Sequence, residues 1–198
     1  MLKRLFDIIF SIIILIVLFP LFLIISLWII IDDGFPVFYL QERIGKDFKP
    51  FKLIKFRTMY KDADKKGLLT VSSKDNRITP SGYYLRKFKL DELPQFINVL
   101  KGEMSIVGPR PEVKKYVELY SDDQKKVLSV KPGITDEASL KYIDESDILA
   151  RSENPEWTYI NEVMPEKLKI NLQYIKNQNL LYDLKIIFWT AKKMFFRD

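Results

Sequence analysis

An apolar run from residue 8 to residue 31 constrains this chain more than any other feature of its sequence. The run has no charged side chain, and Pro20 lies at its middle. At a rise of 1.5 Å per residue, about 24 helical residues would be roughly 36 Å long, enough to cross a hydrocarbon layer of about 30 Å. Each half would be roughly 18 Å long and could not cross alone. The run therefore predicts a segment that lies in a membrane.

Two arrangements of this segment fit the sequence. One is a single crossing with a proline kink, since proline is more frequent in membrane helices than in soluble ones. The other is a re-entrant helix–break–helix, because Pro20 has no N–H for the carbonyl of Ile16 and its ring disfavours helical geometry at Phe19. Lys3 and Arg4 before the run favour a cytoplasmic N-terminus, and a simple crossing would then export the rest of the chain.

Composition narrows the chemistry that the rest of the chain can perform. A net charge of +6 beside an apolar anchor favours an anionic membrane surface or phosphate-bearing substrates, and no nucleic-acid partner is expected. The chain has no Cys and no His. This excludes a thiolate nucleophile, a Ser-His-Asp triad and metal sites built on Cys or His. Catalysis would have to use carboxylates, Lys, Arg, Tyr or hydroxyls, with or without a hard, oxygen-preferring cation.

The residues after the apolar run predict one modest α+β domain. Residues 37–59 alternate partly between apolar and polar side chains around a glycine-containing turn, which predicts a β-hairpin. Pro80 is expected to open a helix with Tyr84, Leu85 and Phe88 on one side. Further elements are predicted as a rigid turn at residues 108–111, a capped helix after Ser121, a turn at Pro132 and Gly133, and a helix that opens at Pro165.

The densest cluster of reactive side chains begins at Arg86. Two adjacent carboxylates, Asp91 and Glu92, follow this basic segment at the predicted start of a helix with Pro94 in its first turn and its end near Gly102. Asp91 is expected to cap this helix, whose N-terminus would favour an ionised carboxylate and a nearby phosphate. A carboxylate, a divalent cation and phosphate-binding cations could together support attack on phosphorus. A structural cap without chemistry fits the same spacing.

Three further groups of residues are weaker candidates for a functional site. Arg110 lies between two prolines and is either a fixed phosphate clamp or a solvated side chain on a turn. Asp62 and Asp64 resemble the Asp-x-Asp metal site of nucleotide-sugar glycosyltransferases, but they stand among lysines in a polar stretch typical of a loop. The string KFRT at residues 55–58 either lines a site from a strand edge, with Lys55 and Arg57 as its cations, or forms the exposed face of that strand.

Residues 180–197 show an amphipathic helical pattern with an aromatic bias. Apolar side chains recur at helical spacing, lysines accompany them, and Trp189 suits a membrane interface. A helix that packs on the core and a helix that lies on lipid headgroups are both compatible with this pattern.

Taken together, these segments resemble the bacterial sugar transferase family, the monotopic phosphoglycosyl transferases. The chain length and the N-terminal apolar segment look like those of the small members that consist of the catalytic core. The matching strings occur in the family's order and read QERIG at 41–45, KFRTM at 55–59, LR at 85–86, DELPQ at 91–95, NVLKGEMSIVGPRP at 98–111 and KPGIT at 131–135.

The resemblance implies an activity and a set of site residues. Such enzymes move a phospho-sugar from a UDP-sugar to a polyprenol phosphate, usually undecaprenyl phosphate, and release UMP. Asp91 falls at the position of the family's nucleophile and would form a covalent phospho-sugar intermediate; Glu92 would be its partner, and both would help to hold Mg²⁺. Arg86 and Arg110 would contact phosphate groups, with Arg57 as a further contact.

The resemblance also implies a membrane arrangement. Residues 1–33 would be a re-entrant helical hairpin broken at Pro20, and residues 34–198 a catalytic domain with C-terminal amphipathic helices. That domain would face the cytosol at the bacterial inner membrane, where UDP-sugars are made. The adjacent Phe19 departs from the Ser-Pro break that is frequent in the family, because no neighbouring hydroxyl is present to satisfy a freed carbonyl.

The identity of the sugar stays open, with an N-acetylated amino or diamino sugar as the expectation from the small members. Larger members continue Gly-x-Ala-Gln where this chain reads DEAS at residues 136–139. Two rival functions come from other classes. One is a membrane-tethered scaffold or regulator without chemistry, and the other is an Asp-x-Asp glycosyltransferase that would use Asp62 and Asp64 and release UDP.

Overall fold

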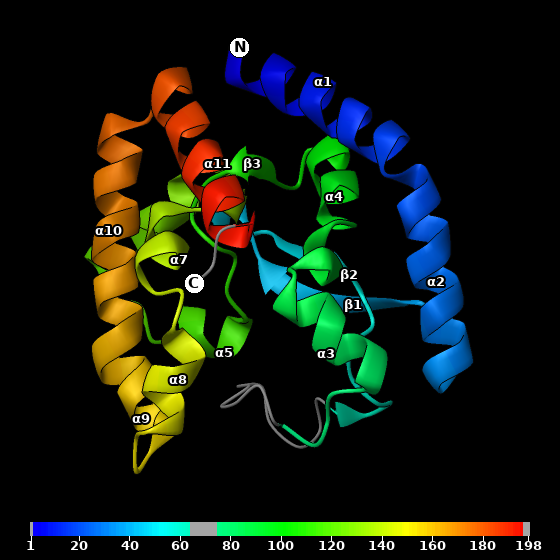
Figure 1. Cartoon of the computed structure of the whole chain (residues 1–198). Coiled ribbons are helices and arrows are strands. Elements are labelled where there is room, and N and C mark those ends of the chain that lie inside the picture. Colours follow the sequence, from blue (N-terminus) through cyan, green and yellow to red (C-terminus); the bar gives the residue numbers. More distant parts are fainter. Residues whose placement is uncertain (1, 64–74, 196–198) are drawn as a thin grey trace.

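The computed structural model describes residues 2–63 and 75–195, and within them helices surround two small two-stranded sheets (Figure 1). This mixture of helix and strand agrees with the predicted fold class. The α-helices are α1 (Leu2–Val17), α2 (Phe19–Asp33), α3 (Pro80–Lys87), α4 (Gln95–Lys101), α5 (Lys114–Val117), α6 (Asp122–Lys125), α7 (Glu137–Lys141), α8 (Glu145–Ala150), α9 (Pro155–Thr158), α10 (Met164–Asn177) and α11 (Leu180–Phe195). The strands are β1 (Phe38–Ile44), β2 (Pro50–Phe56), β3 (Ser105–Val107) and β4 (Gly133–Thr135).

The apolar run forms α2 and most of α1, and the chain bends by 61° between these helices. Among the described residues, no single helix is both long and apolar enough to span a membrane. The two helices of this bent pair, taken together, are long and apolar enough for a broken span or a re-entrant loop. The break lies at Leu18, two residues before the predicted position at Pro20. Phe19 is helical, and Pro20 lies in the first turn of α2. Backbone N–H groups of a first turn make no intrahelical hydrogen bond, so the N–H that proline lacks is not needed there.

Polar side chains fasten both ends of this helix pair to the rest of the protein. At the start of α1, Lys3 Nζ donates to the carbonyl of Val107 at 2.9 Å, and Asp7 Oδ1 accepts the backbone N–H of Ile106 at 3.1 Å. At the end of α2, Asp32 Oδ2 accepts the backbone N–H of Ser81 at 2.9 Å. The pair therefore curves around the body as an arc with two anchored ends (Figure 1).

The predicted β-hairpin is confirmed: β1 and β2 pair antiparallel, with Ile44 opposite Pro50 next to the turn. The side chain of Asn98 in α4 joins this hairpin to the helices. Its Oδ1 accepts the backbone N–H of Ile54 at 3.0 Å, and its Nδ2 donates to the carbonyl of Lys52 at 2.8 Å. Because Asn98 is fully buried, these bonds fix β2 relative to α4.

The second sheet is a short parallel pair, β3 with β4, that the sequence pattern did not predict. Gly133 opens β4, so the predicted turn at this position is wrong. The two strands approach so closely that only glycine fits: a Cβ on Gly133 would lie 2.1 Å from the nitrogen of Gly108. The pairing aligns the loop after β3, which carries Arg110, with the segment that enters α7.

The C-terminal helices enclose a core of their own beside the hairpin. The capping box at Ser121 is confirmed, and Pro165 lies in the first turn of α10 as expected. Leu168 of α10 is buried in this core. A π-helical turn, Tyr159–Val163, precedes α10 and was not predicted.

Candidate active site

The two adjacent carboxylates lie on a short 3₁₀ turn, Leu90–Glu92, between α3 and α4. Lys89 adopts a left-handed backbone conformation (φ 56°) and separates α3 from this turn. The prediction that Asp91 caps the next helix is wrong, because α4 begins at Gln95 after Pro94 and has no side-chain cap. Asp91 is therefore presented by a turn, and its carboxylate is not used in capping.

Asp91 is buried, with 8% of its surface exposed. Across the described part of the chain, no side chain or backbone N–H donates a hydrogen bond to its carboxylate. Burial, followed by the negative charge of Glu92, raises the pKa of Asp91 above its usual value, while Lys55, Arg86 and Lys89 oppose this rise. Asp91 is thus a carboxylate with both oxygens available and with three cations around it.

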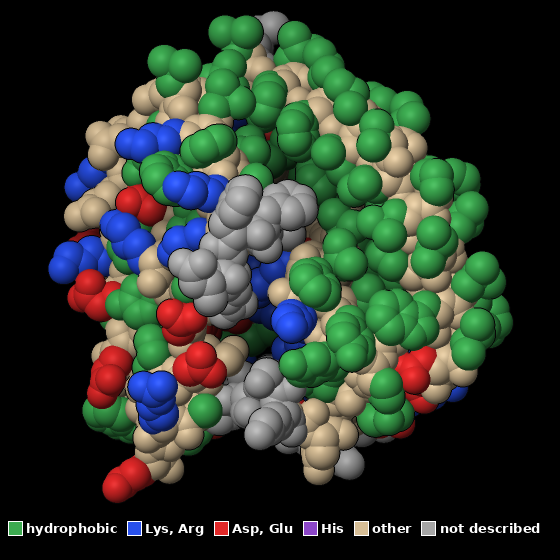
Figure 2. All heavy atoms as spheres, in the orientation of Figure 1, with side chains coloured by type: hydrophobic (Ala, Val, Ile, Leu, Met, Phe, Trp, Pro, Cys, Tyr) green, Lys and Arg blue, Asp and Glu red, His purple; other side chains and the backbone are tan. Residues whose placement is uncertain are grey.

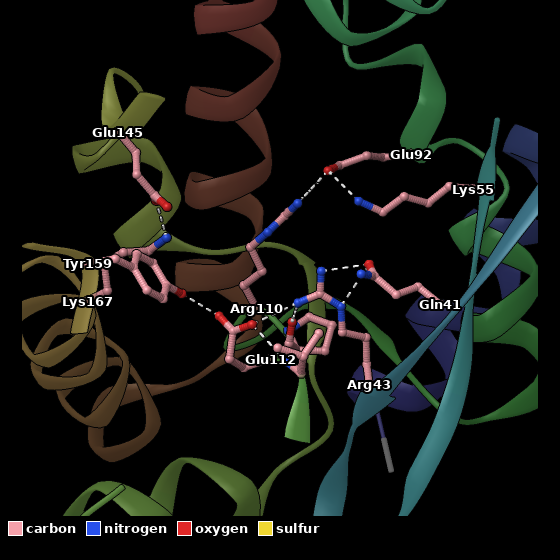
Figure 3. A network of polar contacts seen from close by, with 11 residues as sticks. Gln41, Arg43, Lys55, Glu92, Arg110, Glu112, Glu145, Tyr159 and Lys167 are labelled. Carbon is pink, nitrogen blue, oxygen red and sulfur yellow. Dashed lines mark hydrogen bonds and ion pairs between the residues drawn. The ribbon is translucent and has the colours of Figure 1, made fainter. Parts of the chain in front are cut away.

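Glu92, in contrast, is held by two cations (Figure 3). Its carboxylate accepts hydrogen bonds from Arg110, at 2.6 Å from Nη2 to Oε1 and at 3.4 Å from Nη1 to Oε2, and Lys55 Nζ lies 3.6 Å from Oε1. Burial opposes ionisation of Glu92, but the positive charges of Arg110 and then Lys55 outweigh it and hold its pKa well below the usual range. Glu92 therefore stays ionised, and its charge discourages ionisation of Asp91.

Lys55 lies at the site, so of the two interpretations that the sequence left open for this residue, a site-lining position and an exposed strand face, the first holds. It comes from β2, and its side chain is 16% exposed. Burial lowers its pKa from 10.5 to about 8, against the opposing effect of Glu92. An amine so close to its neutral form at a carboxylate pair is typical of a functional site. The KFRTM string contains it, but no local spacing links β2 to the turn that carries Glu92.

Arg110 reaches Glu92 from the loop after β3, and its side chain is 34% exposed. Its neighbour Glu112 fastens this loop to β1: Arg43 Nη1 donates to Glu112 Oε1 at 2.9 Å and to the carbonyl of Pro111 at 3.1 Å. Tyr159 donates to the other oxygen of Glu112 (Figure 3). The predicted rigid turn is thus a loop with fixed partners on both sides, which orients Arg110.

Arg86 and Arg57 differ in where they lie. Arg86, in the last turn of α3, is half-buried; burial lowers its pKa, and the negative charge of Asp91 opposes that effect. Arg57 is 5% exposed and is engaged at the end of α2, where Nη1 lies 2.9 Å from Asp33 Oδ2 and Nη2 donates to the carbonyl of Gly34 at 2.5 Å. The charge of Arg86 therefore acts on Asp91, whereas Arg57 anchors the end of the helix pair.

A profile of proteins described as bacterial sugar transferases matches residues 1–197. The chain belongs to this family. The resemblance that its motifs predicted is thereby confirmed.

Three relatives illustrate the breadth of the bacterial sugar transferase family. The UDP-glucose:undecaprenyl-phosphate glucose-1-phosphate transferase of Escherichia coli is 37% identical over 98% of this chain and 40% of its own length. The uncharacterized sugar transferase EpsL of Bacillus subtilis is 36% identical over 98% of the chain and 87% of its length. A putative undecaprenyl-phosphate N-acetylgalactosaminyl 1-phosphate transferase of the same organism is 43% identical over 61% of the chain and 68% of its length. The chain thus spans two fifths of the Escherichia coli relative.

The donor groups at the site suit one kind of metal ion. In residues 2–63 and 75–195, no cluster of three or more carboxylates could hold a metal by itself. Asp91 and Glu92 do offer two neighbouring carboxylates, and Mg²⁺ in phosphate-transferring sites is often bound by one or two carboxylates together with substrate phosphates and water. The free oxygens of Asp91 fit such an ion. Asp64, the second carboxylate of the Asp-x-Asp string, lies outside the described residues.

Proposed function

We propose that this chain is a phosphoglycosyl transferase that moves a phospho-sugar from a UDP-sugar to undecaprenyl phosphate and releases UMP. The activities named for its relatives support this class of donor and acceptor. The observation that carries the chemistry is the contrast within the carboxylate pair. Asp91 has free oxygens among cations, whereas Glu92 is held ionised by Arg110 and Lys55.

In the first step, a carboxylate oxygen of Asp91 attacks the β-phosphorus of the UDP-sugar. A new phosphorus–oxygen bond joins the phospho-sugar to Asp91, and the bond to the bridging oxygen breaks, so that UMP leaves with that oxygen. Only the ionised carboxylate can attack. Lys55, Arg86 and Lys89 favour that form and balance the negative charge of the diphosphate.

In the second step, a phosphate oxygen of undecaprenyl phosphate attacks the same phosphorus. The bond to Asp91 breaks, the carboxylate is regenerated, and the product is undecaprenyl diphosphate sugar. Glu92 and Arg110 act as a fixed pair that keeps the guanidinium at the position of the transferred phosphoryl group. Mg²⁺, held by Asp91 and Glu92, would neutralise negative charge on the phosphate oxygens.

The anchored ends of the helix pair support a re-entrant arrangement. A straight crossing would carry the two ends of residues 1–33 to opposite membrane surfaces. Here Lys3 at one end and Asp32 at the other both bind the catalytic body. The outer surface of α1 and α2 exposes large apolar side chains, among them Ile13 and Leu23 at 53% and 52% (Figure 2). Residues 34–198 would then lie at the cytoplasmic face of the inner membrane, where UDP-sugars are available.

The decisive experiment measures the nucleotide product and the state of the protein together. The purified full chain is incubated with Mg²⁺, undecaprenyl phosphate and a panel of UDP-sugars. UMP is expected from at least one donor, and donor labelled at the β-phosphorus should leave label on the chain when the acceptor is omitted. Asp91→Asn should abolish both, while Asp122→Asn, on an exposed carboxylate of α6, should change neither.

Two outcomes would contradict the proposal. Release of UDP instead of UMP would indicate the Asp-x-Asp glycosyltransferase. Absence of any nucleotide from every donor, with folded protein and intact membrane binding, would favour the scaffold.

A further inference from the structure

Helix α3 exposes an aromatic surface next to the candidate active site. The sequence pattern predicts Tyr84, Leu85 and Phe88 on one side of this helix, but only Leu85 is buried. Tyr83, Tyr84 and Phe88 are 43%, 50% and 50% exposed. Large apolar side chains exposed together usually mark a binding surface rather than chance exposure.

This surface continues onto the outer face of α2. The ring centroids of Trp28 and Tyr84 are 5.9 Å apart, and those of Tyr83 and Tyr84 are 5.3 Å apart. Trp28 is itself 40% exposed. We call Trp28, Tyr83, Tyr84 and Phe88 the α3 aromatic face. Figure 2 shows hydrophobic side chains gathered over α1, α2 and α3, with Lys and Arg side chains at the border toward the centre of the molecule.

A cation that acts on Asp91 lies at the side of this face away from Trp28. Successive residues of an α-helix are about 100° apart, so Arg86 lies about 60° from Tyr83 around α3, on the side away from Tyr84. Lys87 lies between Tyr83 and Tyr84 around the helix, and its Nζ is 5.7 Å from the ring centroid of Phe88. The positive charges of Arg86 and Lys89 both act on Asp91. The surface is therefore apolar where Tyr84 meets α2, and the cation on its opposite side, Arg86, is one that acts on the nucleophile.

We propose that the α3 aromatic face binds the first isoprene units of the polyprenyl phosphate acceptor and directs its phosphate past Arg86 to Asp91. This assignment rests on the proposed function. The polarity of the surface selects the occupant: an apolar tail would lie along Trp28 and Tyr84, and a single anionic group would lie at Arg86. If this surface only contacted membrane lipid, a cation that acts on a buried carboxylate would not be needed at its side. The polyprenyl phosphate acceptor has an apolar tail and an anionic phosphate, and these match the apolar and the cationic sides of the surface.

The test compares two pairs of exposed apolar side chains. Tyr84→Ala with Phe88→Ala removes two rings of the α3 aromatic face. Leu184→Ala with Phe188→Ala removes two exposed apolar side chains of α11 and is the matched control. The full chain is assayed in vesicles for the KM of undecaprenyl phosphate, for the KM of the UDP-sugar, and for UMP release in a single turnover without acceptor. Co-sedimentation with the same vesicles and the thermal midpoint report membrane binding and folding.

The α3 variant is expected to raise the acceptor KM about tenfold, because two buried ring contacts with the tail are lost. Its donor KM, single-turnover UMP release and thermal midpoint should not change, and Tyr84→Phe with Phe88→Leu should restore the acceptor KM. An unchanged acceptor KM, or an equal rise in the α11 variant that follows weaker vesicle binding, would overturn the assignment. If the unaltered chain releases no UMP from any donor, the proposed function fails; if UMP release is normal and only the acceptor prediction fails, the proposed function stands.

Discussion

Lys55 offers a direct test of the electrostatics of the site, because burial disfavours its positive charge. Its pKa falls from 10.5 to about 8, and burial is the largest cause. One pKa unit corresponds to about 1.4 kcal/mol, so keeping Lys55 charged lowers the free energy of unfolding by about 3 kcal/mol at neutral pH. Lys55→Met keeps most of the side-chain volume and removes the charge. We therefore expect this variant to be more stable at pH 7, by up to about 3 kcal/mol.

The pH dependence of this gain has a defined sign. The folded-state pKa of Lys55 lies below the unfolded-state value, so the destabilisation is fully present below about pH 8 and disappears as the pH rises through 10.5. The advantage of Lys55→Met should shrink over the same window. Lys55→Met should increase stability but lower the rate of UMP release by about 100-fold, because Glu92 and the substrate phosphates lose a fixed cation.

Thermal unfolding in one detergent at pH 7 and pH 10 measures the stability prediction. For a chain of this size, about 3 kcal/mol corresponds to a rise of roughly 6 to 12 °C in the midpoint at pH 7. Lys52→Met, on the exposed side of the same strand, is the control and should shift the midpoint little. A lower midpoint for Lys55→Met at pH 7 would refute the reasoning, since the attraction between Lys55 and Glu92 would then exceed the effect of burial.

Three further predictions follow from the same contacts. Single-turnover UMP release should rise with pH on the acid side as Asp91, whose pKa is raised, loses its proton, and should fall above about pH 8 as Lys55 loses its own; Lys55→Arg should remove only the alkaline decline in a pH–rate profile. Asp7→Asn replaces, with an NH2 group, one of the two buried oxygens that accept hydrogen bonds from Ser105 and Ile106, and should lower the free energy of unfolding by about 2 kcal/mol, measured by chemical denaturation. Arg57→Met should destabilise by about 3 kcal/mol because it leaves Asp33 unpaired at the end of α2, and Arg57→Met with Asp33→Asn should recover part of that loss.

Local patterns predicted the elements that local chemistry determines. Partial alternation around a glycine turn gave the hairpin of β1 and β2, and the capping residues at Ser121 gave the helix that follows. The parallel pair of β3 and β4 was missed, since three residues per strand are too few to show a period. Its close approach depends on Gly108 and Gly133, which read in sequence only as turn residues.

The sequence named the site residues as candidates but did not show which of them lie together. Asp91 and Glu92 follow Arg86 in one segment, and Arg110 was left open between a phosphate clamp and a solvated turn. Lys55 was left open as well, because its approach to Glu92 requires the packing of β2 against the turn after α3, which no spacing encodes. Arg57, two residues later, was expected at the site, yet it is directed to the end of α2.

The charged side chains near the start of α1 link the apolar helix pair to the loop that carries Arg110. Strand β3 pairs with β4, and two side chains of α1 also bond to its backbone: Asp7 accepts from Ile106, and Lys3 donates to Val107. The chain then passes to Arg110. A carboxylate at the border of an apolar run is costly unless it is paired, and here it accepts the Ile106 N–H and the Ser105 hydroxyl. Any displacement of α1 must therefore break bonds to β3, which couples the position of α1 to the position of the guanidinium beside Glu92.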